Sequence, residues 1–244
     1  MFFKDYEIKF YEVDYKNQLK ESVLLNFLQD IAATHAEKLG FGYSYIKDKN
    51  LGWFLLKYHL KVYEYPKNLN KITIRTWPKA INKLSCLRDF EIYTPEGEKI
   101  ASVCSSWVLI DTTTKKIMQP MQVLQQFPTK NANAFDTNFP KLQEFQNPDY
   151  KKIFEVRYDD IDINRHVNNA NYLIWALETL DFDFRSQNVI KELEIQYKKE
   201  MKYGDDVTSI AEINKDTLIT NHILKNSSTD EILCSIRSTW QKSC

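Results

Sequence analysis

The chain has 244 residues, and its 33 basic and 33 acidic side chains leave no formal net charge at pH 7. This balance gives no overall field toward nucleic acid or anionic membranes, so we expect neither as a partner. Apolar residues make up 43% and aromatic residues 14%, which excludes a disordered chain and allows one large domain or two of ordinary size.

The first ten residues, MFFKDYEIKF, lack a charged region followed by a sustained apolar stretch, which argues against a signal peptide. The longest nearly apolar runs, Trp53 to Leu56 and Trp107 to Ile110, are too short to cross a bilayer. The cysteines lie far apart and form no CxxC pair, which favours free buried thiols (Cys86, Cys104, Cys234 and Cys244). We therefore expect a cytoplasmic protein without membrane insertion.

The sequence repeats itself. Residues 6–18, YEIKFYEVDYKNQ, match residues 154–166, FEVRYDDIDINRH, and both segments alternate apolar and polar residues as a half-buried strand does. A second match pairs Ala101, Val103, Ser105 and Trp107 with Cys234, Ile236, Ser238 and Trp240, each set predicting the last strand of a half. Two matches in the same order indicate two copies of one fold.

Each half has the same predicted plan. In the first, Ser22 is expected to cap a helix that Gly40 ends, and in the second, Asn168 or Asn169 caps a shorter helix with leucines on one stripe. Strands are predicted after each helix, at 53–63, 70–77, 84–93 and 100–110, and at 192–199, 206–213, 217–225 and 231–240. The TPEG segment at 94–97 predicts a turn.

The join between the halves is rich in Gln, Asn and Pro without periodicity, so residues 119–149 are interpreted as a linker between domains 1–118 and 150–244. One strand, one helix and a run of antiparallel strands predict an α+β fold in each domain, with the sheet wrapped around a central helix. The strand order does not follow from the sequence.

A dense polar cluster lies where the second half passes from strand to helix, at Asp160, Asp162, Asn164, His166, Asn168 and Asn169. The first half keeps Asp14 at the position of Asp162, but has Lys16 and Gln18 in place of the amide and the imidazole. This asymmetry suggests that one half kept a site and the other became scaffold. Capping and turn formation are the alternative roles for Asn168 and Asn169.

Metal binding is not favoured. The alternation from Asp160 to Asn164 resembles a calcium loop, but Arg165 replaces the glycine and Asn171 the glutamate that such a loop needs. The four histidines are not paired at the spacing of zinc ligands. We expect no metal and no cofactor.

The stretch DIDINRHVNNANYLIW, residues 160–175, resembles the signature D-(L/I)-D-x-N-x-H-V-N-N-x-x-Y-x-x-W of the acyl-acyl carrier protein thioesterases of plant plastids and their bacterial relatives. Residues 197–200, YKKE, are similar to a second motif of that family, a basic pair followed by a glutamate. The resemblance covers nearly the whole chain. It implies a tandem hotdog fold and an enzyme that hydrolyses the acyl thioester and releases free fatty acid, which ends fatty acid synthesis.

Carried over by position, the resemblance implies catalytic roles for Asp162, Asn164, His166 and Glu200. Many plant members have a cysteine after the glutamate, where this chain has Met201, so thiol chemistry is not expected. We expect Glu200 and His166 to activate a water, Asp162 to orient them, and Asn164 to position the water or the thioester. Whether Glu200 or Asp162 accepts the proton, and whether an anhydride forms instead, stays open.

Backbone N–H groups at the start of the second-half helix, near Asn168 and Asn169, could receive the carbonyl oxygen, because a helix N-terminus presents free donors. The resemblance also implies that the first half forms the acyl pocket, with Trp53 and Phe54 as candidate lining or else ordinary core. The acidic carrier protein suggests a basic rim, for which a solvated surface is the alternative reading, at Arg165, Lys198, Lys199 and Lys202.

Two rival functions remain at this point: a hotdog thioesterase acting on acyl-CoA, and a non-catalytic module that binds acyl carrier protein. The oligomeric state is also open, because the tandem either mimics a dimer of single hotdogs by itself or pairs again as a homodimer.

Overall fold

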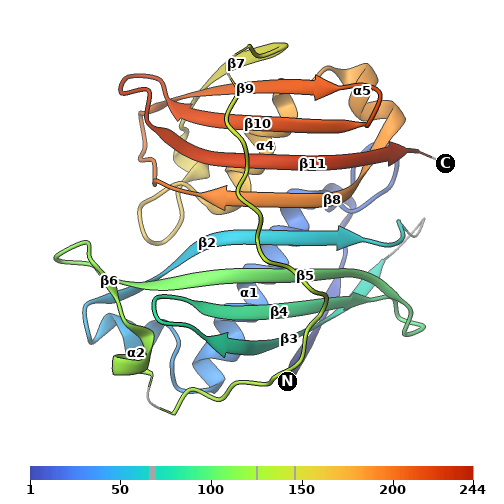
Figure 1. Ribbon diagram of the computed structural model, residues 1–244. Helices are drawn as coiled ribbons and strands as arrows, with labels where there is room; N and C mark the ends of the chain where they lie inside the picture. The colour runs from blue at the N-terminus through green and yellow to red at the C-terminus, as the bar shows by residue number, and fades with distance from the viewer. Residues whose placement is uncertain (66–69, 125, 146, 244) are drawn as a thin grey trace. The chain divides into compact units, whose positions relative to one another are not determined.

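The computed structural model describes residues 1–65, 70–124, 126–145 and 147–243. The chain divides into two compact units, Met1–Asn138 and Phe139–Cys244, and each unit holds an antiparallel sheet and a helix that packs against it (Figure 1). This arrangement confirms the predicted α+β class. No helix in the described part of the chain is long and apolar enough to cross a membrane.

The first unit contains a five-stranded sheet in the order β1-β3-β4-β5-β2, with the short β6 paired to β5. Every neighbouring pair is antiparallel. Strand β5 lies between β4 and β2 and is buried along most of its length, which explains its run of apolar and small residues. The strands are β1 (Phe2–Glu7), β2 (Leu51–Val62), β3 (Lys71–Ile81), β4 (Cys86–Tyr93), β5 (Lys99–Asp111) and β6 (Ile117–Met118).

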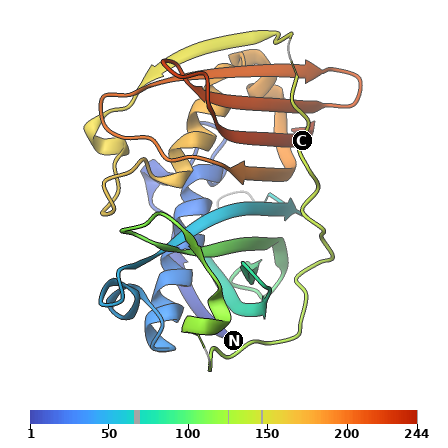
Figure 2. The same cartoon turned by 60° about the vertical axis from the view of Figure 1, so that its left-hand side comes forward.

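Helix α1 (Glu21–Lys38) packs against β1 and β3 and runs along one face of this sheet (Figure 2). Its stripe of Leu25, Leu28 and Ile31 is fully buried. The predicted end is confirmed: Gly40 has a φ of 77°, and the N–H of the next residue, Phe41, bonds back to the carbonyl of residue 36. The predicted start is wrong by two residues, because Lys20 occupies the cap position and residue 22 lies in the first turn.

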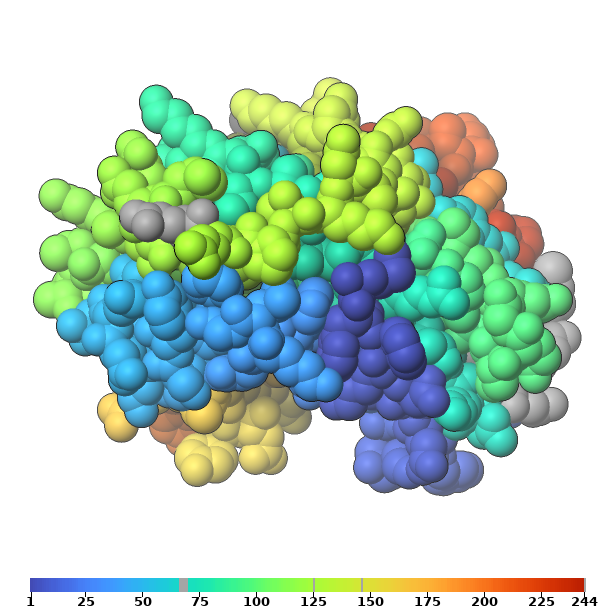
Figure 3. Space-filling model, turned by 90° about the horizontal axis from the view of Figure 1, so that it is seen from below, coloured from blue at the N-terminus to red at the C-terminus, as the bar shows by residue number. Residues whose placement is uncertain are grey.

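The short helix α2 (Tyr43–Lys47) follows α1 along the chain. The opposite face of the first sheet is covered by the segment that follows the short helix α3 (Pro120–Val123). The Trp77 indole donates to the carbonyl of residue 132, and the Asp89 carboxylate accepts from the N–H of residue 134. In Figure 3 this yellow-green segment lies against the surface of the first unit. Residues 119–138, which lie in the predicted linker, thus belong to the first unit.

The second unit repeats the plan with a sheet in the order β8-β11-β10-β9-β7, again antiparallel throughout. Helix α4 (Asn169–Thr179) packs against it with Leu173 and Leu177 buried, as the leucine stripe predicts, and α5 (Phe182–Gln187) follows. The strands are β7 (Tyr150–Glu155), β8 (Asn188–Tyr197), β9 (Asp206–Asn214), β10 (Ile219–Asn226) and β11 (Ile232–Lys242).

The internal repeat is confirmed down to single hydrogen bonds. The N–H of Asp14 bonds the carbonyl of Gln18 at 2.8 Å, and at the matching positions the N–H of Asp162 bonds the carbonyl of His166 at 2.8 Å. Each loop also contains one residue with positive φ at the same place, Asn17 at 61° and Arg165 at 64°.

The predicted strands at 6–18 and 154–166 are right only at their beginnings, since β1 ends at Glu7 and β7 at Glu155. Each strand passes into a 3-10 turn, Phe10–Glu12 or Tyr158–Asp160, that an acidic side chain closes on the backbone. Tyr158 and Ile163 are 82% and 80% exposed, so the alternation does not mark a buried strand face.

Candidate active site

The loop between β7 and α4 is fixed by a buried carboxylate. Asp160 is 2% exposed and accepts hydrogen bonds from the backbone N–H of Arg157 at 2.8 Å and from its guanidinium at 2.8 and 3.2 Å. At the other end, the Asp160 carbonyl accepts from the Asn168 N–H at 2.8 Å and from the Asn171 side chain at 3.1 Å. One residue therefore holds both ends of the loop that carries the predicted catalytic groups.

The tip of this loop is a tight turn. The Asp162 N–H bonds the His166 carbonyl at 2.8 Å, and the Arg165 N–H bonds the Asp162 carbonyl at 3.0 Å. Arg165 adopts a left-handed backbone conformation, with φ of 64°, to close the turn. As a result Asp162 and His166 lie opposite each other at its base.

The Asp162 carboxylate is bound to Asn164. One oxygen accepts from the Asn164 backbone N–H at 2.8 Å, and the other accepts from its side-chain amide at 3.3 Å. Within the described part of the chain, neither oxygen of Asp162 bonds the His166 ring. Asp162 thus orients the Asn164 amide. No contact in the described residues supports the expectation that Asp162 also orients the imidazole.

The structure brings Glu200 to His166. The Oε2 atom of Glu200 lies 3.2 Å from Nε2 of His166, with side chains 40% and 22% exposed respectively. Glu200 lies three residues after the end of β8, whereas His166 precedes α4, so the pair joins two segments that are distant in sequence. A carboxylate 3.2 Å from an imidazole nitrogen, with both groups reachable by solvent, can support the imidazole as it accepts a proton from a water.

A buried tyrosine of α4 holds the backbone on both sides of Glu200. The Tyr172 hydroxyl donates to the Lys199 carbonyl at 3.4 Å and accepts from the Met201 N–H at 3.1 Å. The Met201 carbonyl in turn accepts from the N–H of Val167 at 3.0 Å, next to His166. Burial raises the pKa of Tyr172, so its hydroxyl stays a donor. Tyr172 had no predicted role, although it is the tyrosine of the signature.

The start of α4 is capped by its own side chains. The Asn168 side-chain oxygen accepts from the Ala170 N–H at 2.9 Å, and the Asn168 carbonyl accepts from the Asn171 N–H at 2.9 Å. The carbonyl of Asn169 accepts from the Tyr197 hydroxyl at 3.1 Å. The N–H groups of Ala170 and Asn171 therefore both bond to Asn168. Asn168 thus caps the helix, which was the alternative to a role in substrate binding.

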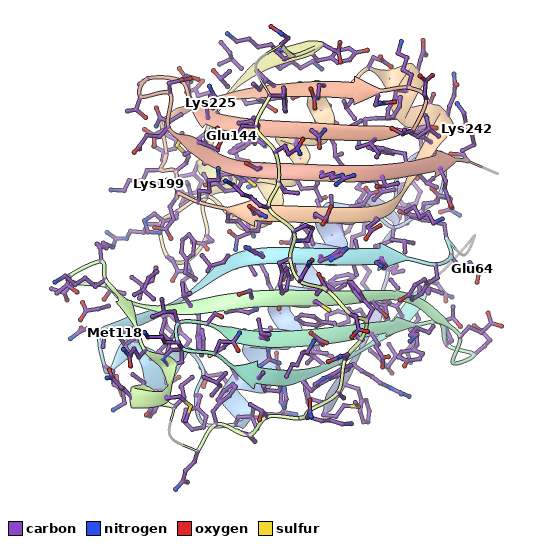
Figure 4. All side chains as sticks on the ribbon, viewed as in Figure 1. Glu64, Met118, Glu144, Lys199, Lys225 and Lys242 are labelled. Carbon is purple, nitrogen blue, oxygen red and sulfur yellow. The ribbon has the colours of Figure 1, made fainter. Side chains whose placement is uncertain are left out.

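The predicted basic rim is exposed, but two of its lysines are already paired. Lys198 lies 3.3 Å from Glu144 and Lys199 lies 3.2 Å from Glu231. Figure 4 shows Lys199 and Lys225 at the same end of the second-unit strands and Lys242 at the opposite end. The other two members, Arg165 and Lys202, are exposed on the loops that carry His166 and Glu200.

The structure does not bring Trp53 and Phe54 together. They are neighbours on β2, so their side chains point to opposite faces of the sheet. Trp53 packs beside a buried cluster of Ile46, Leu51, Cys86, Leu109 and Leu124, and its indole donates to the Phe41 carbonyl at 3.3 Å. Only Trp53 lies on the face with this cluster.

The matching loop of the first unit lacks the catalytic groups. The Asp14 carboxylate accepts from the backbone N–H groups of Lys16 at 2.9 Å and Gln18 at 3.0 Å, and so supports its own turn. The scaffold is kept there while the amide and the imidazole are replaced.

Two family models match the chain. The N-terminal domain of acyl-ACP thioesterases matches residues 1–126, and the C-terminal domain of the same enzymes matches residues 144–242. The chain belongs to the acyl-ACP thioesterase family. Its two units are the tandem hotdog domains that the family resemblance implied, and the acyl-ACP thioesterase motifs lie in the loop and strand end described above.

Similar proteins come from plants and bacteria. The chain is 25% identical over 224 residues to oleoyl-acyl carrier protein thioesterase 2 of Arabidopsis thaliana, a match that covers 83% of this chain and 60% of that protein. The chain spans between 60% and 65% of the length of the first curated relatives it matches.

Solved structures share the fold. A protein of Lactobacillus plantarum, provisionally named an oleoyl thioesterase, is 26% identical with a TM-score of 0.90, covering 99% of this chain and 96% of that one. The 12:0-ACP thioesterase of Umbellularia californica is 21% identical with a TM-score of 0.88, covering 99% and 97%.

Thiol chemistry gains no support at this site. Cys86, Cys104 and Cys234 are free and buried, as predicted, while Cys244 lies outside the described residues. Burial raises the pKa of Cys86 and of Cys104 to about 12 and raises that of Cys234 as well, so these thiols stay protonated at neutral pH. Met201 is 1% exposed and points away from solvent.

Proposed function

We propose that this family member hydrolyses the thioester of fatty acyl-acyl carrier protein, releases free fatty acid and so ends fatty acid synthesis. The observation that carries the proposal is the 3.2 Å distance between His166 and Glu200. The loop that holds His166 is itself fixed by hydrogen bonds to the buried Asp160 carboxylate. The family match adds to it, because relatives with this plan carry acyl-ACP thioesterase names.

In this mechanism the imidazole and the carboxylate act as one unit. Glu200 accepts the hydrogen bond from Nε2–H of His166, which leaves Nδ1 to take a proton from the attacking water. The carboxylate stabilises the imidazolium that forms. Asp162 is assigned the role of orienting Asn164, because both of its carboxylate oxygens accept from that residue.

Water attack on the thioester carbonyl creates an oxyanion that needs a donor. We assign this role to the Asn164 amide, whose second hydrogen is not used by Asp162. The start of α4 is a weaker candidate because its Ala170 and Asn171 N–H groups are held in the cap. When the intermediate collapses, the carbon–sulfur bond breaks and the imidazolium returns its proton to the thiolate.

The acyl carrier protein is the proposed partner, with Arg165 and Lys202 as its first contacts. Both are exposed and lie on the two loops that carry His166 and Glu200. Lys198 and Lys199 also contact the carrier protein once their ion pairs with Glu144 and Glu231 break. Breaking such exposed ion pairs costs little free energy.

In this proposal the first unit has lost its catalytic groups and contributes apolar surface for the acyl chain. Trp53 is the candidate residue that lines this surface. The support is its intact turn at Asp14 without the amide and imidazole, together with the partly buried aromatic group around Trp53. We also propose a cytoplasmic location, which suits the three free buried thiols.

The test is release of free fatty acid from acyl carrier protein loaded with acyl chains of graded length. His166→Ala and Glu200→Gln should each lower kcat by roughly 10²- to 10⁴-fold, as loss of a general base does. Glu155→Gln, which changes an exposed carboxylate at the end of β7, is the matched control and should keep normal turnover.

Three outcomes would count against the proposal. Near-normal hydrolysis by folded His166→Ala and Glu200→Gln would remove the mechanism. Faster hydrolysis of acyl-CoA than of the carrier-bound thioester would move the substrate to acyl-CoA. Binding of loaded carrier protein without release of fatty acid would make the chain a binding module.

A further inference from the structure

A buried arginine of the first unit has no carboxylate partner in the described part of the chain. Arg88 on β4 is 7% exposed, and its Nη1 atom donates to Nδ1 of His35 on α1 at 3.1 Å and to the Thr76 hydroxyl on β3 at 3.2 Å. Within the described residues, no Asp or Glu side chain forms an ion pair with it. Its neighbour Asp89 points to the other face of the sheet, where it accepts from the Ala134 N–H.

This network carries an uncompensated positive charge. A guanidinium only donates, so Nδ1 of His35 must be unprotonated and the imidazole neutral. Burial and the charge of Arg88 agree with this, since they lower the pKa of His35 to about 4. Burial lowers the pKa of Arg88 only to about 10, so it stays cationic at neutral pH. A buried charge without a counterion is strongly unfavourable.

An unsatisfied hydroxyl lies beside this charge. Ser105 on β5 is directly opposite Tyr58 on β2 and directly opposite Arg88 on β4, so the three side chains share one face in a cross-strand row. The Tyr58 hydroxyl is buried and has no hydrogen-bond partner among the residues that the structure describes. Ser105 is satisfied, because it donates to the Arg88 carbonyl and accepts from the Trp107 indole.

A buried apolar cluster continues from this row on the same face of the sheet. Cys86 precedes Arg88 by two residues on β4 and belongs to the cluster that contains Leu51 and Leu109 and that Trp53 borders. The face therefore offers two donors, one of them charged, at one end and hydrocarbon contacts at the other.

We propose that this face binds the carboxylate of an aliphatic chain, with the carboxylate on Arg88 and Tyr58 and the hydrocarbon along the Trp53 cluster. A carboxylate supplies both the missing counterion and an acceptor for the phenol. The site lies within the first unit and needs no hydrolysis at His166, so it goes beyond the proposed function. Two sources share this chemistry: a free fatty acid, or the far end of a dicarboxylic acyl chain.

The first experiment measures binding of decanoate and decanol to the full chain by calorimetry. Decanoate should bind more tightly than decanol, and Arg88→Met should weaken decanoate about 10- to 100-fold, the range of a charge-assisted hydrogen bond. Arg75→Met is the matched control, because Arg75 is an exposed arginine of the same unit that stacks on Tyr93. It should leave binding unchanged, and thermal unfolding checks that each variant folds.

Tyr58→Phe removes only the hydroxyl and keeps the ring, so it tests the site even if Arg88→Met fails to fold. It should weaken decanoate binding and leave decanol unaffected. No binding of decanoate to the wild-type chain, equal binding of decanoate and decanol, or no loss in Tyr58→Phe would each overturn the proposal.

A second experiment separates the two sources by comparing hydrolysis of decanedioyl- and decanoyl-acyl carrier protein. A preference for the dicarboxylic chain that Arg88→Met abolishes identifies its far end as the ligand. Equal rates, together with decanoate binding that depends on Arg88, identify the free fatty acid. Because calorimetry requires no turnover, a chain that binds decanoate but hydrolyses neither thioester would refute the proposed function and leave this site standing.

Discussion

The Tyr172 hydroxyl lies 3.1 Å from the backbone nitrogen of Met201, and the same oxygen reaches the carbonyl of residue 199 at 3.4 Å. One side chain of α4 thus fixes the peptide units on both sides of Glu200. Since Glu200 is 40% exposed and comes after the end of β8, this contact is a main restraint on its position.

Tyr172→Phe should therefore lower kcat by roughly 10- to 100-fold, because small displacements of a catalytic group have effects of that size. The free energy of unfolding should fall by about 1–3 kcal/mol, since the buried N–H of Met201 loses its acceptor. Steady-state kinetics on acyl carrier protein substrate and urea unfolding measure the two effects.

Tyr197→Phe is the matched control. It removes the hydroxyl of another buried tyrosine, which donates to the Asn169 carbonyl at the start of α4. It should reduce stability by a similar amount and retain kcat. If Tyr172→Phe kept normal kcat while it lost stability, the tyrosine would be structural only.

Much of the fold follows from the sequence. The eight strands predicted after the helices are all present, because alternation at period two reports the buried face of a sheet. The same signal failed at residues 156–166, where Ile163 is 80% exposed and a turn closed by Asp160 replaces the strand. Alternation alone does not distinguish a pleated strand from a polar loop with local hydrogen bonds.

The site, like the fold, was predictable from the sequence only in part. The contact of His166 with Glu200 was expected from two motifs, whereas the bracing by Tyr172 and the binding of Asp162 to Asn164 depend on atomic geometry that no spacing specifies. The buried charge of Arg88 was also invisible in sequence, because an arginine on a strand with alternating residues usually faces solvent.

Two buried histidines should make stability depend on acidity. Burial lowers the pKa of His222 to about 3, and burial with the charge of Arg88 lowers that of His35 to about 4. An unfolded histidine gains a proton below about pH 6.5, whereas these folded ones resist protonation until far lower pH. Their contribution is therefore complete above about pH 6.5 and is lost as the pH falls toward 4 and then 3.

Each histidine should add about 1.4 kcal/mol per pH unit to the loss of unfolding free energy below pH 6.5. His222→Gln should reduce this slope between pH 6 and pH 5, and His35→Gln/His222→Gln should reduce it about twice as much. Urea unfolding at both pH values measures it. An unchanged slope in the double variant would show that carboxylates alone cause the acid sensitivity.

Charge reversal tests the carrier-protein surface. Arg165→Glu/Lys202→Glu should lower kcat/KM on acyl carrier protein by about 10-fold or more at low salt, with a smaller loss at high salt, because these residues act through exposed charge. A short acyl thioester without carrier protein should be hydrolysed at the normal rate. Lys242→Glu, at the opposite end of the strands (Figure 4), is the control and should change neither substrate.

The internal repeat provides a control for the loop itself. Asp160 accepts from the Arg157 N–H at 2.8 Å, and Glu12 accepts from the Lys9 N–H at 2.7 Å at the matching place in the first unit. Asp160→Asn should lower the free energy of unfolding by about 1.5–3 kcal/mol, because it weakens charge-assisted hydrogen bonds to a buried carboxylate. It should also lower kcat, since this loop carries His166.

Glu12→Gln makes the same chemical change in the loop that has Lys16 and Gln18 instead of catalytic groups. It should reduce stability by a smaller amount, because this turn is more exposed, and leave kcat unchanged. Kinetics and urea unfolding on both variants therefore separate loop stability from catalysis. An equal loss of kcat in Glu12→Gln would show that the first loop also serves the reaction and that the division of labour between the halves is wrong.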